Sequence, residues 1–457
     1  MRILLVNSAD VGGGAEGSAY RLFNALQDRG HESWLAVGKK RGTHEKIFQI
    51  PNDEHRNSWA KFVYKKLSSS HENNLAPHVL SLLRIAAEPR RWLERQLGVE
   101  DFNYPGSRHL LELTPDCPDI VHLLNLHGDY FDLGLLPGLS RQVPVILNPR
   151  DAWLLSGHCA HASECDRWKT GCGHCPDLTR YPSIKRDATA YNWKRKGRIF
   201  AQSHLYITTP SHWLMNEIEQ SILSKAIVKS CVIPTGIDLA VFFPSDKNVV
   251  RTRLGIPLDS RVLLFTANKN DPKNNWKDNQ TVLSAIEQVL ERLSGQKILF
   301  IALGGAYAQI GKSEIKFVPF QQDRNIVADY YRAADVYLHA ARADTFPNAV
   351  MESLACGTPV IATNVGGIPE QVNGFGDSAP NNRDVGSATG ILVNLENIEE
   401  MADAMLRLLT NEPLRSQLGK NAIQDSRQRF DFDDQMSRFL DWYQEVIEHW
   451  MITFGRR

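Results

Sequence analysis

Asp344 and Glu352 are two carboxylates on either side of a short polar loop that leads into an expected helix. Gly357 and Pro359 are typical signals for the end of that helix. Backbone N–H groups at the start of a helix lie at the positive end of its dipole, where they can bind phosphate. A carboxylate on each side can accept hydrogen bonds from sugar hydroxyls. Because a nucleotide-sugar offers both kinds of group, the pattern predicts a site for such a ligand.

The same pair is open to a second interpretation, as the general acid and base of a hydrolase. Two carboxylates are common on any protein surface, so their spacing alone does not decide between the two. The context favours the binding loop, because a buried-looking strand at residues 360–363 and a turn at Gly366 and Gly367 follow directly.

Residues 268–278 form a run rich in asparagine and lysine, just after an expected buried strand at residues 262–265. In a Rossmann-like unit this position binds phosphate. Lys277 opens the next helix and is best placed to neutralise a diphosphate, with Lys273 as a second candidate. The alternative is a solvated turn, but the strand before and the helix after the run favour a binding role.

Gly12, Gly14 and Gly17 follow the first expected strand with the spacing of a dinucleotide-binding loop. That loop requires an acidic residue at the end of the second strand, to bind a ribose hydroxyl. Lys39 and Lys40 stand there instead, which leaves open an oxidoreductase that binds a phosphorylated ribose. In either case the glycines let the backbone approach an anion closely at a helix N-terminus.

Two successive series of strands and helices run along the chain. We expect strands at residues 3–6, 34–37, 120–124, 143–147 and 205–209, and then at 262–265, 298–303, 315–318, 336–339 and 360–363. This alternation predicts an α/β protein with two facing Rossmann-like domains and a ligand site in the interdomain cleft. The expected domains are residues 1–234 and 235–431, with an amphipathic helix within 432–457 packing back on the first.

The composition excludes several classes of protein. The 457 residues include 52 basic and 52 acidic side chains, so no global charge points to nucleic acid as a partner. The apolar run at residues 3–6 is too short for a signal peptide, and no run approaches the ~20 apolar residues of a membrane-spanning helix. We expect a soluble, cytoplasmic protein.

Four of the seven cysteines crowd into one short segment, at Cys159, Cys165, Cys172 and Cys175. The last two form a Cys-x-x-Cys half-site typical of structural zinc, although the first two are spaced more widely than usual. Nearby histidines, which could replace a cysteine, are His158, His161 and His174. The alternative is a compact glycine-rich loop in which the thiols merely pack.

Residues 58–100 interleave aromatic and aliphatic side chains with lysines and arginines. One interpretation is a surface that meets a membrane or a lipid-linked acceptor, at the inner face of the membrane. We favour the simpler alternative, an amphipathic helix pair with a solvated basic face.

Residues 344–370 resemble the donor-binding motif of glycosyltransferase family 4, whose members are retaining enzymes of the GT-B fold. The likeness covers nearly the whole chain. Residues 12–14 resemble the family's N-terminal glycine loop, and residues 233–238 resemble its interdomain segment. Residues 150–176 are similar to a Cys-rich insertion in one bacterial branch of the family.

The resemblance implies a role for each matching position. Asp344 would face the donor sugar, Glu352 would hydrogen-bond the nucleotide ribose, and Lys277 would pair with the diphosphate. Gly14 would let the N-terminal loop approach the same diphosphate, and Lys273 could supply a further basic group. The backbone groups implied to hold donor hydroxyls and phosphate belong to Phe346, Pro347, Asn348 and Ala349.

The chain departs from the family pattern at several positions. Asp344 stands where glutamate is usual, so the first carboxylate is one methylene shorter. Arg150 precedes Asp151 where many members carry histidine, and Leu124 replaces another histidine, which leaves His127 as the nearest imidazole. His127, Arg150 and Asp151 are therefore the acceptor-side candidates.

The resemblance implies a glycosyltransferase that moves a sugar, with retention, from a UDP-, GDP- or ADP-sugar to a glycan or lipid-linked saccharide. Such a reaction belongs to polysaccharide or cell-surface glycan biosynthesis and requires no cofactor. The alternatives are a Rossmann-type NAD(P)-dependent oxidoreductase and a non-catalytic nucleotide-sugar-binding protein. A glycoside phosphorylase is less favoured, because the context of its cofactor lysine is not recognisable.

Overall fold

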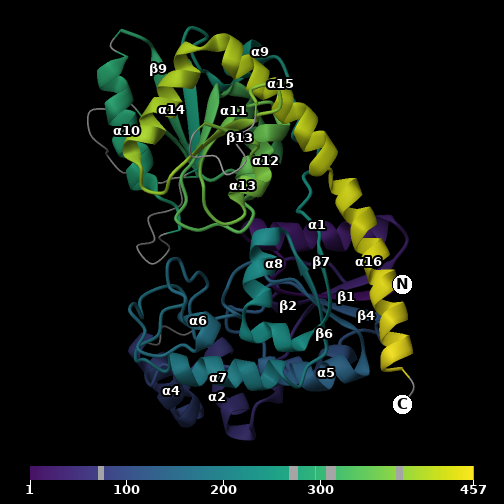
Figure 1. The fold of residues 1–457 in the computed structure, drawn as a ribbon. Helices are drawn as coiled ribbons and strands as arrows, with labels where there is room; N and C mark the ends of the chain where they lie inside the picture. Colours follow the sequence, from purple (N-terminus) through teal and green to yellow (C-terminus); the bar gives the residue numbers. More distant parts are fainter. Residues whose placement is uncertain (70–76, 267–275, 294, 305–314, 377–383, 456–457) are drawn as a thin grey trace. The chain divides into compact units, whose positions relative to one another are not determined.

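The computed structural model describes residues 1–457 except 70–76, 267–275, 294, 305–314, 377–383 and 456–457. The chain divides into two compact units (Figure 1). The first contains Met1–Thr209, Met215–Val232 and Arg438–Arg457, and the second contains Pro210–Leu214 and Ile233–Ser437.

The first unit is built on a parallel sheet, which has seven strands within the described residues, in the order β3-β2-β1-β4-β5-β6-β7. Residues 3–6, in the interior strand between β2 and β4, are fully buried, as expected of a parallel sheet whose two faces are both covered. The strands are β1 (Arg2–Ala9), β2 (Glu32–Lys39), β3 (Ile47–Gln49), β4 (Ile120–Leu123), β5 (Val145–Leu147), β6 (Leu205–Thr209) and β7 (Ile227–Val232).

The helices of the first unit include α1 (Gly14–Asp28), whose buried Ala19, Leu22, Phe23 and Leu26 recur at helical spacing. The others in the described residues are α2 (Ser58–Ser69), α3 (Pro77–Ala87), α4 (Pro89–Gln96), α5 (Leu136–Gln142), α6 (Arg167–Thr170), α7 (Thr189–Phe200) and most of α8 (His212–Glu219). Short 3-10 helices are η1 (Asp53–His55), η3 (Pro105–Glu112), η4 (Leu133–Leu135) and η5 (Ile222–Ala226).

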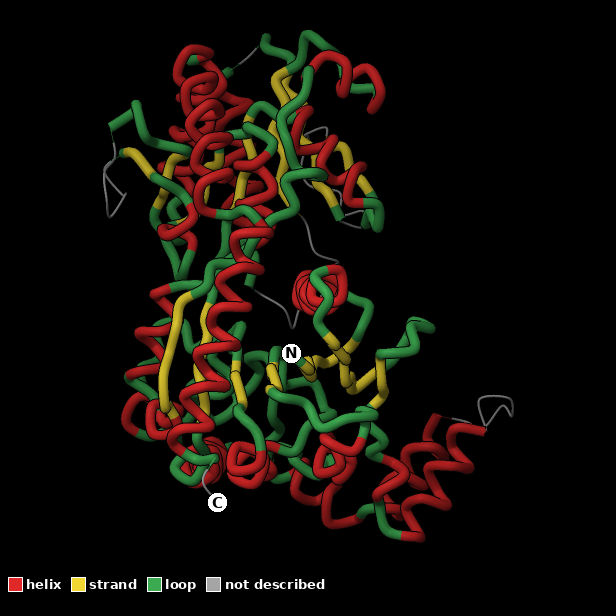
Figure 2. Tube along the Cα trace, turned by 90° about the vertical axis from the view of Figure 1, so that its right-hand side faces the viewer, coloured by secondary structure: helices red, strands yellow, loops and turns green. Residues whose placement is uncertain are grey.

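Helices α2 and α3 form a hairpin that extends away from the sheet of the first unit (Figure 2). Ala60 and Val63 of α2 pack on Ala87 of α3 in a small core of their own, together with Tyr64 and Leu83. Because α4 follows directly, the described part of residues 58–100 contains three helices rather than the expected pair.

The second unit repeats the architecture, with the strand order β10-β9-β8-β11-β12-β14-β13 and parallel pairing throughout its described part. The strands are β8 (Arg261–Thr266), β9 (Ile298–Leu303), β10 (Ile315–Val318), β11 (Val336–His339), β12 (Val360–Thr363), β13 (Gly374–Phe375) and β14 (Gly390–Val393). The helices are α9 (Lys247–Leu254), α10 (Asn279–Arg292), α11 (Arg324–Ala333), α12 (Asn348–Ala355), α13 (Ile368–Gln371), α14 (Ile398–Thr410) and α15 (Glu412–Arg429).

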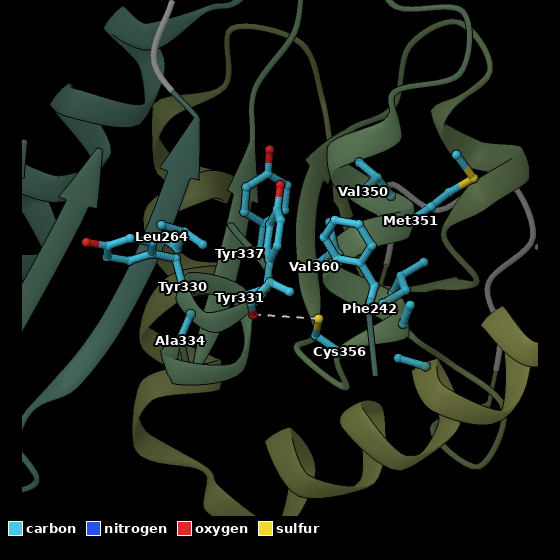
Figure 3. Close-up of a cluster of buried hydrophobic side chains, with 14 of the residues drawn as sticks. Phe242, Leu264, Tyr330, Tyr331, Ala334, Tyr337, Val350, Met351, Cys356 and Val360 are labelled. Carbon is cyan, nitrogen blue, oxygen red and sulfur yellow. Dashed lines mark hydrogen bonds between the residues drawn. The ribbon is translucent and has the colours of Figure 1, made fainter. Parts of the chain in front are cut away.

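Hydrophobic cores lie on both faces of the second sheet. Val262 and Leu264 of β8 belong to the core that includes α11 and α12, and part of this core is drawn in Figure 3. Leu263 and Phe265 belong to the core that includes α10 and α14. Successive residues of β8 therefore alternate between the two cores, as the period of a strand requires.

The last helix, α16 (Phe432–Thr453), belongs to the first unit from Arg438 onward. Its Tyr443 hydroxyl lies 2.7 Å from Nδ1 of His122 on β4. Nδ1 of His449 lies 2.8 Å from the hydroxyl of Tyr206 on β6. These contacts hold the end of α16 against the first sheet.

The predicted fold class, α/β with two Rossmann-like domains, is confirmed. Five of the predicted strands have the same bounds in the structure, namely β6, β9, β10, β11 and β12. In the parts of the chain that the structure describes, no helix combines the length and the apolarity needed to cross a bilayer.

Candidate functional site

The candidate site of the second unit lies where β8 and β11 end. β8 pairs with β9 on one side and with β11 on the other, so the connections to these neighbours leave in opposite directions. Such a switch point, at the carboxyl ends of the strands, is where open α/β sheets bind ligands. Lys277 follows β8 and Asp344 follows β11, so chain order brings both to this edge.

The backbone at Asp344 is held by the glycine turn that follows β12. The carbonyl oxygen of Asp344 accepts the N–H of Gly367 at 3.1 Å. Gly366 has a φ of +58°, and a Cβ atom there would lie 1.9 Å from the same carbonyl oxygen. Glycine is therefore required at this turn, both for the left-handed backbone and for the close approach.

The start of α12 carries fewer free N–H groups than the sequence analysis expects. Pro347 is the N-cap and has no N–H, and the N–H of Phe346 donates to Oδ1 of Asp344 at 3.3 Å. Asn348 and Ala349 remain, at the first two helical positions, and no side chain caps this end of the helix. Nε2 of Gln371 donates to the carbonyl oxygen of Pro347 at 3.1 Å and fixes the loop.

Lys277 lies beside the same loop, because an isolated antiparallel β-bridge joins its backbone to that of Ala341. Its Nζ donates to Oγ1 of Thr266, the last residue of β8, at 2.6 Å. Burial lowers the pKa of the ammonium group, against the opposite effect of the carboxylates of Asp344 and Glu352. Both carboxylates therefore lie within electrostatic reach of Lys277. Lys273 lies outside the described residues.

Glu352 lies on α12, and its Oε2 accepts a hydrogen bond from the hydroxyl of Tyr331 at 3.1 Å. Tyr331 lies on α11 and its ring makes an edge contact with Tyr337 of β11, with the ring centroids 5.3 Å apart. In Figure 3 the hydroxyl groups of both tyrosines point in the same direction. Burial and the nearby carboxylate raise the pKa of Tyr331, which keeps its hydroxyl a donor.

Three residues of this edge are missing from the sequence analysis: Thr266, Tyr337 and His339. The Tyr337 hydroxyl lies 3.0 Å from Oγ1 of Thr266 and 3.2 Å from Nδ1 of His339. The sequence signal was present, because polar side chains at the ends of neighbouring parallel strands meet at the same edge. These side chains could not be grouped from the sequence alone, because the sequence does not show that β8 lies next to β11.

In the first unit, His127 and Asp151 form a close pair, with Nε2 and Oδ2 2.6 Å apart. Burial alone would lower the pKa of His127, but the Asp151 carboxylate outweighs it and raises the pKa. Burial would raise the pKa of Asp151, and the imidazole outweighs that effect and lowers it. Oδ1 of Asp151 also accepts the N–H of Trp153 at 2.9 Å.

Arg150, the neighbour of Asp151, lies within electrostatic reach of Arg21 and His122. Burial, together with Arg21, lowers the pKa of its guanidinium group to about 10. Burial and Arg150 also lower the pKa of His122 to about 3, so this imidazole is neutral. His122 therefore packs against α16 as a neutral group, whereas His127 and Asp151 each shift the pKa of the other toward its charged form.

The glycine loop of the first unit leads into α1, which begins at Gly14. The N-cap is Gly13, so no side-chain hydrogen bond caps the start of this helix. Nζ of Lys40 donates to the carbonyl oxygens of His44 and Ile47, at 3.0 Å and 2.8 Å. Because Lys40 is committed to these carbonyls, it is poorly placed for the phosphate of a phosphorylated ribose. This argues against the oxidoreductase alternative.

The segment that carries Asp151 and the clustered cysteines is tied to a buried lysine. Nζ of Lys196, fully buried, donates to the carbonyl oxygens of Trp153 and Ser156 and to Oε1 of Glu100, at 2.7, 3.1 and 2.9 Å. These three bonds satisfy the ammonium group and fix the loop after β5.

The cysteines give the zinc hypothesis no support. Sγ of Cys172 accepts the N–H of Gly157 at 3.3 Å, and Sγ of Cys175 lies 3.4 Å from Nε2 of His158. Burial raises the pKa of the thiols of Cys159 and Cys175, and that of Cys172 to about 12. Across the described residues, no group of three or more His, Cys, Asp or Glu side chains is arranged to hold a metal ion.

Comparison with known proteins finds a family match within the second unit. Residues 260–411 match the family of glycosyl transferases group 1. This segment is therefore similar to the group 1 glycosyl transferases. It contains Lys277, Asp344 and Glu352 together with the loop and helix between them.

Curated relatives of the chain are glycosyltransferases by name. The D-inositol 3-phosphate glycosyltransferase of Saccharomonospora viridis is 28% identical over 232 residues, which cover 47% of this chain and 50% of that protein. The chain spans about half the length of the curated relatives it matches.

Solved structures extend the likeness in fold to nearly the whole chain. Sucrose-phosphate synthase from Thermosynechococcus elongatus gives a TM-score of 0.59 at 15% identity, with 98% of this chain and all of that one covered. Anabaena HepE in complex with UDP gives a TM-score of 0.60 at 14% identity, with 97% and 100% covered. At this identity these two structures show the fold alone, two Rossmann-like domains.

Proposed function

We propose that the protein is a nucleotide-sugar-dependent glycosyltransferase whose donor site lies at the carboxyl ends of β8 and β11. The observation that carries the proposal is that Lys277 and Asp344 follow the neighbouring strands β8 and β11, with Glu352 on the helix after Asp344. A cation beside an uncapped helix start suits a diphosphate, and two carboxylates suit the hydroxyls of a sugar and a ribose. The family match over the same residues supports this assignment.

In the proposed reaction, Lys277 and the N–H groups at the start of α12 stabilise the charge that grows on the departing diphosphate. Such fixed electrostatic groups typically contribute the largest part of an enzyme's rate enhancement. Asp344 orients the donor sugar and Glu352 the ribose. As the bond between the sugar and the diphosphate breaks, the acceptor hydroxyl attacks the oxocarbenium-like centre from the face that the diphosphate vacates and gives its proton to the departing diphosphate oxygen. The anomeric configuration is therefore retained.

The proposed acceptor is a glycan or a lipid-linked saccharide, bound by the first unit. Its candidate residues are His127, Arg150 and Asp151, and Gly14 would bring the glycine loop to the diphosphate. The charged pair of His127 and Asp151 suits hydroxyl groups, because it offers both a donor and an acceptor. Under this proposal the reaction serves polysaccharide or cell-surface glycan biosynthesis.

The test begins with thermal unfolding in the presence of UDP-, GDP- and ADP-sugars. A ligand at 100 times its Kd stabilises the folded state by about 2.7 kcal/mol, which is enough to identify the donor base. UDP-sugars come first, because the HepE structure was solved with UDP. We expect stabilisation by one class of nucleotide-sugar, followed by transfer of its sugar to an acceptor glycan.

The same measurements separate the alternatives. A non-catalytic binding protein would be stabilised by a nucleotide-sugar but would release no nucleoside diphosphate from it. An oxidoreductase would be stabilised by NAD(P) and by no nucleotide-sugar. Either result would contradict the proposal.

We also propose that the α2–α4 segment contacts an anionic membrane surface. Trp59 and Phe62 of α2 are 54% and 52% exposed, and their rings stack on each other with centroids 6.1 Å apart. Ala60 and Val63 of α2 pack on α3, and Nε1 of Trp59 donates to the carbonyl oxygen of Ala86 on α3 at 2.9 Å, while the rings stay exposed. Further exposed apolar side chains in the segment are Val79, Leu82, Trp92, Leu93 and Leu97.

The charged side chains of this segment favour contact with anionic lipid headgroups. The carboxylate of Glu88 is paired with Arg56 and Arg91, at 2.8 Å and 2.9 Å, so it adds little negative field. Lys61 and Lys65 are exposed on α2 beside the stacked rings. Exposed aromatic groups flanked by basic side chains are typical of interfacial helices.

Cosedimentation with vesicles tests the membrane proposal. We expect binding to vesicles that contain phosphatidylglycerol, little binding to phosphatidylcholine alone, and loss of binding in the double variant Phe62→Ser, Leu82→Ser. Phe320→Ser is the matched control, because Phe320 is 69% exposed on the second unit. Equal binding by the double variant and the control would contradict the proposal.

A further inference from the structure

A chain of polar side chains connects Lys277 with Asp344 along the carboxyl edge of the second sheet. It runs from Nζ of Lys277 to Oγ1 of Thr266 at 2.6 Å, and on to the Tyr337 hydroxyl at 3.0 Å. From there it continues to Nδ1 of His339 at 3.2 Å. Nε2 of His339 then lies 3.6 Å from Oδ2 of Asp344.

The directions of these hydrogen bonds follow from the chemistry of the groups. The ammonium group of Lys277 can only donate, so Oγ1 of Thr266 accepts from it and has its own proton to give to Tyr337. The Tyr337 hydroxyl then donates to Nδ1 of His339. Burial raises the pKa of Tyr337 and lowers that of His339, so the hydroxyl stays protonated and the imidazole neutral.

A neutral imidazole that accepts at Nδ1 carries its single proton on Nε2. His339 is 2% exposed, and within the described residues its Nε2 makes no hydrogen bond. An N–H group buried without an acceptor is costly, and the carboxylate of Asp344 is the group it faces. A shift of about 0.6 Å would bring the two atoms to ordinary hydrogen-bond distance.

We propose that His339 is a positioning residue that orients the Asp344 carboxylate toward the donor sugar, with its tautomer set by Lys277 through Thr266 and Tyr337. This inference rests on the proposed function and extends it. It accounts for the shorter acid at position 344, because a side chain one methylene shorter than glutamate gains its fixed direction from the imidazole behind it. It also links Lys277, which would pair with the diphosphate, to Asp344, which would bind the sugar.

Two substitutions at one position separate the role of Nε2 from a role in packing. His339→Gln keeps an N–H donor at the place of Nε2, whereas His339→Asn keeps a polar group only at the place of Nδ1. Tyr337→Phe keeps the ring in the core and removes only the hydroxyl that links Thr266 to His339.

Isothermal titration with UDP-glucose and with UDP gives the decisive comparison, or with GDP-mannose and GDP if the screen selects that base. For His339→Asn we expect binding of the nucleotide-sugar to weaken about tenfold or more, as for loss of a hydrogen bond to a charged group. Binding of the nucleoside diphosphate should change less than about twofold, because it does not use Asp344. His339→Gln should restore most of the loss, and Tyr337→Phe should resemble His339→Asn.

Several results would overturn the inference. One is wild-type affinity for the nucleotide-sugar in His339→Asn. Another is an equal loss of both ligands in the Asn and Gln variants, because His339 would then only support the fold. Failure of the proposed function is a separate result, in which the wild-type protein itself binds no nucleotide-sugar.

Discussion

The carbonyl oxygen of Asp344 accepts the N–H of Gly367 at 3.1 Å, so the turn after β12 holds the acidic loop after β11. Gly366 and Gly367 pack so closely that Cβ atoms on them would lie 1.9 Å from the carbonyl oxygen of Asp344 and 2.0 Å from that of Thr345. Each of these contacts is with backbone, which cannot rotate away. The two glycines therefore fix the backbone position of Asp344, the candidate sugar-binding residue.

Gly366→Ala should displace the Asp344 loop. We expect at least a tenfold loss in nucleotide-sugar binding by titration calorimetry, and a loss of unfolding free energy of about 1–3 kcal/mol from overpacking in urea denaturation. Gly255→Ala is the matched control, because Gly255 has a φ of +63° but open space around its Cα. It should lower stability by about 1 kcal/mol and leave binding unchanged. Equal effects of the two variants on binding would contradict this account of the turn.

Asp335 should make the second unit sensitive to acid. Its carboxylate accepts from Nη2 of Arg251 and from the N–H of Val262, each at 2.8 Å, and from Nζ of Lys247 at 2.9 Å. Burial would raise the pKa of Asp335, but Lys247 and Arg251 outweigh it and lower the pKa to about 2. Because the folded-state pKa is depressed, the stabilisation is present above the unfolded value of about 3.9 and is lost as pH falls toward about 2.

The comparison that isolates this effect is wild type against Asp335→Asn. At pH 7 we expect the variant to lose about 3 kcal/mol of unfolding free energy, because Arg251 is left buried without its charge partner. At pH 3 the difference between the two proteins should be smaller, since the wild-type advantage is then partly lost. A difference that stays constant between pH 7 and pH 3 would show that the Asp335 charge is not its source.

His127 and Asp151 should matter for the acceptor and not for the donor. In a proton NMR titration, His127 should lose its proton above the usual value of about 6.5, and below it in Asp151→Asn, where burial acts unopposed. Asp151→Asn and His127→Ala should lower sugar transfer about tenfold to a hundredfold, with nucleotide-sugar affinity unchanged. A loss of nucleotide-sugar affinity equal to the loss of transfer would place these residues on the donor side instead.

Much of the fold was predictable because buried parallel strands leave simple patterns. The strands at residues 298–303 and 336–339 read as short apolar runs, and the structure has the same bounds. The strands β3, β7, β13 and β14 were missed. All four lie toward the sheet edges, and β3, β13 and β14 are also short. The number of helices within residues 58–100 was underestimated, because Pro89 begins a separate helix there.

The candidate site was partly predictable for the same reason. Lys277 and Asp344 each follow a strand of a βα unit, and neighbouring parallel strands end at the same edge. The partners Thr266, Tyr337 and His339 were not predictable, because their meeting depends on β8 lying next to β11. For the clustered cysteines the sequence offered a zinc site as one alternative, whereas the described residues contain no group of three or more metal-ligating side chains arranged to hold an ion.

The most direct test of the central claim is turnover of the stabilising nucleotide-sugar by wild type, Lys277→Ala and Glu352→Ala, measured as nucleoside diphosphate released with a glycolipid extract as acceptor. Lys297→Ala is the matched control, because Lys297 is 70% exposed in the same unit. We predict that Lys277→Ala and Glu352→Ala each lose about a hundredfold or more in rate, with unfolding midpoints near wild type and normal turnover in the control. Near-normal turnover by both Lys277→Ala and Glu352→Ala would contradict the account.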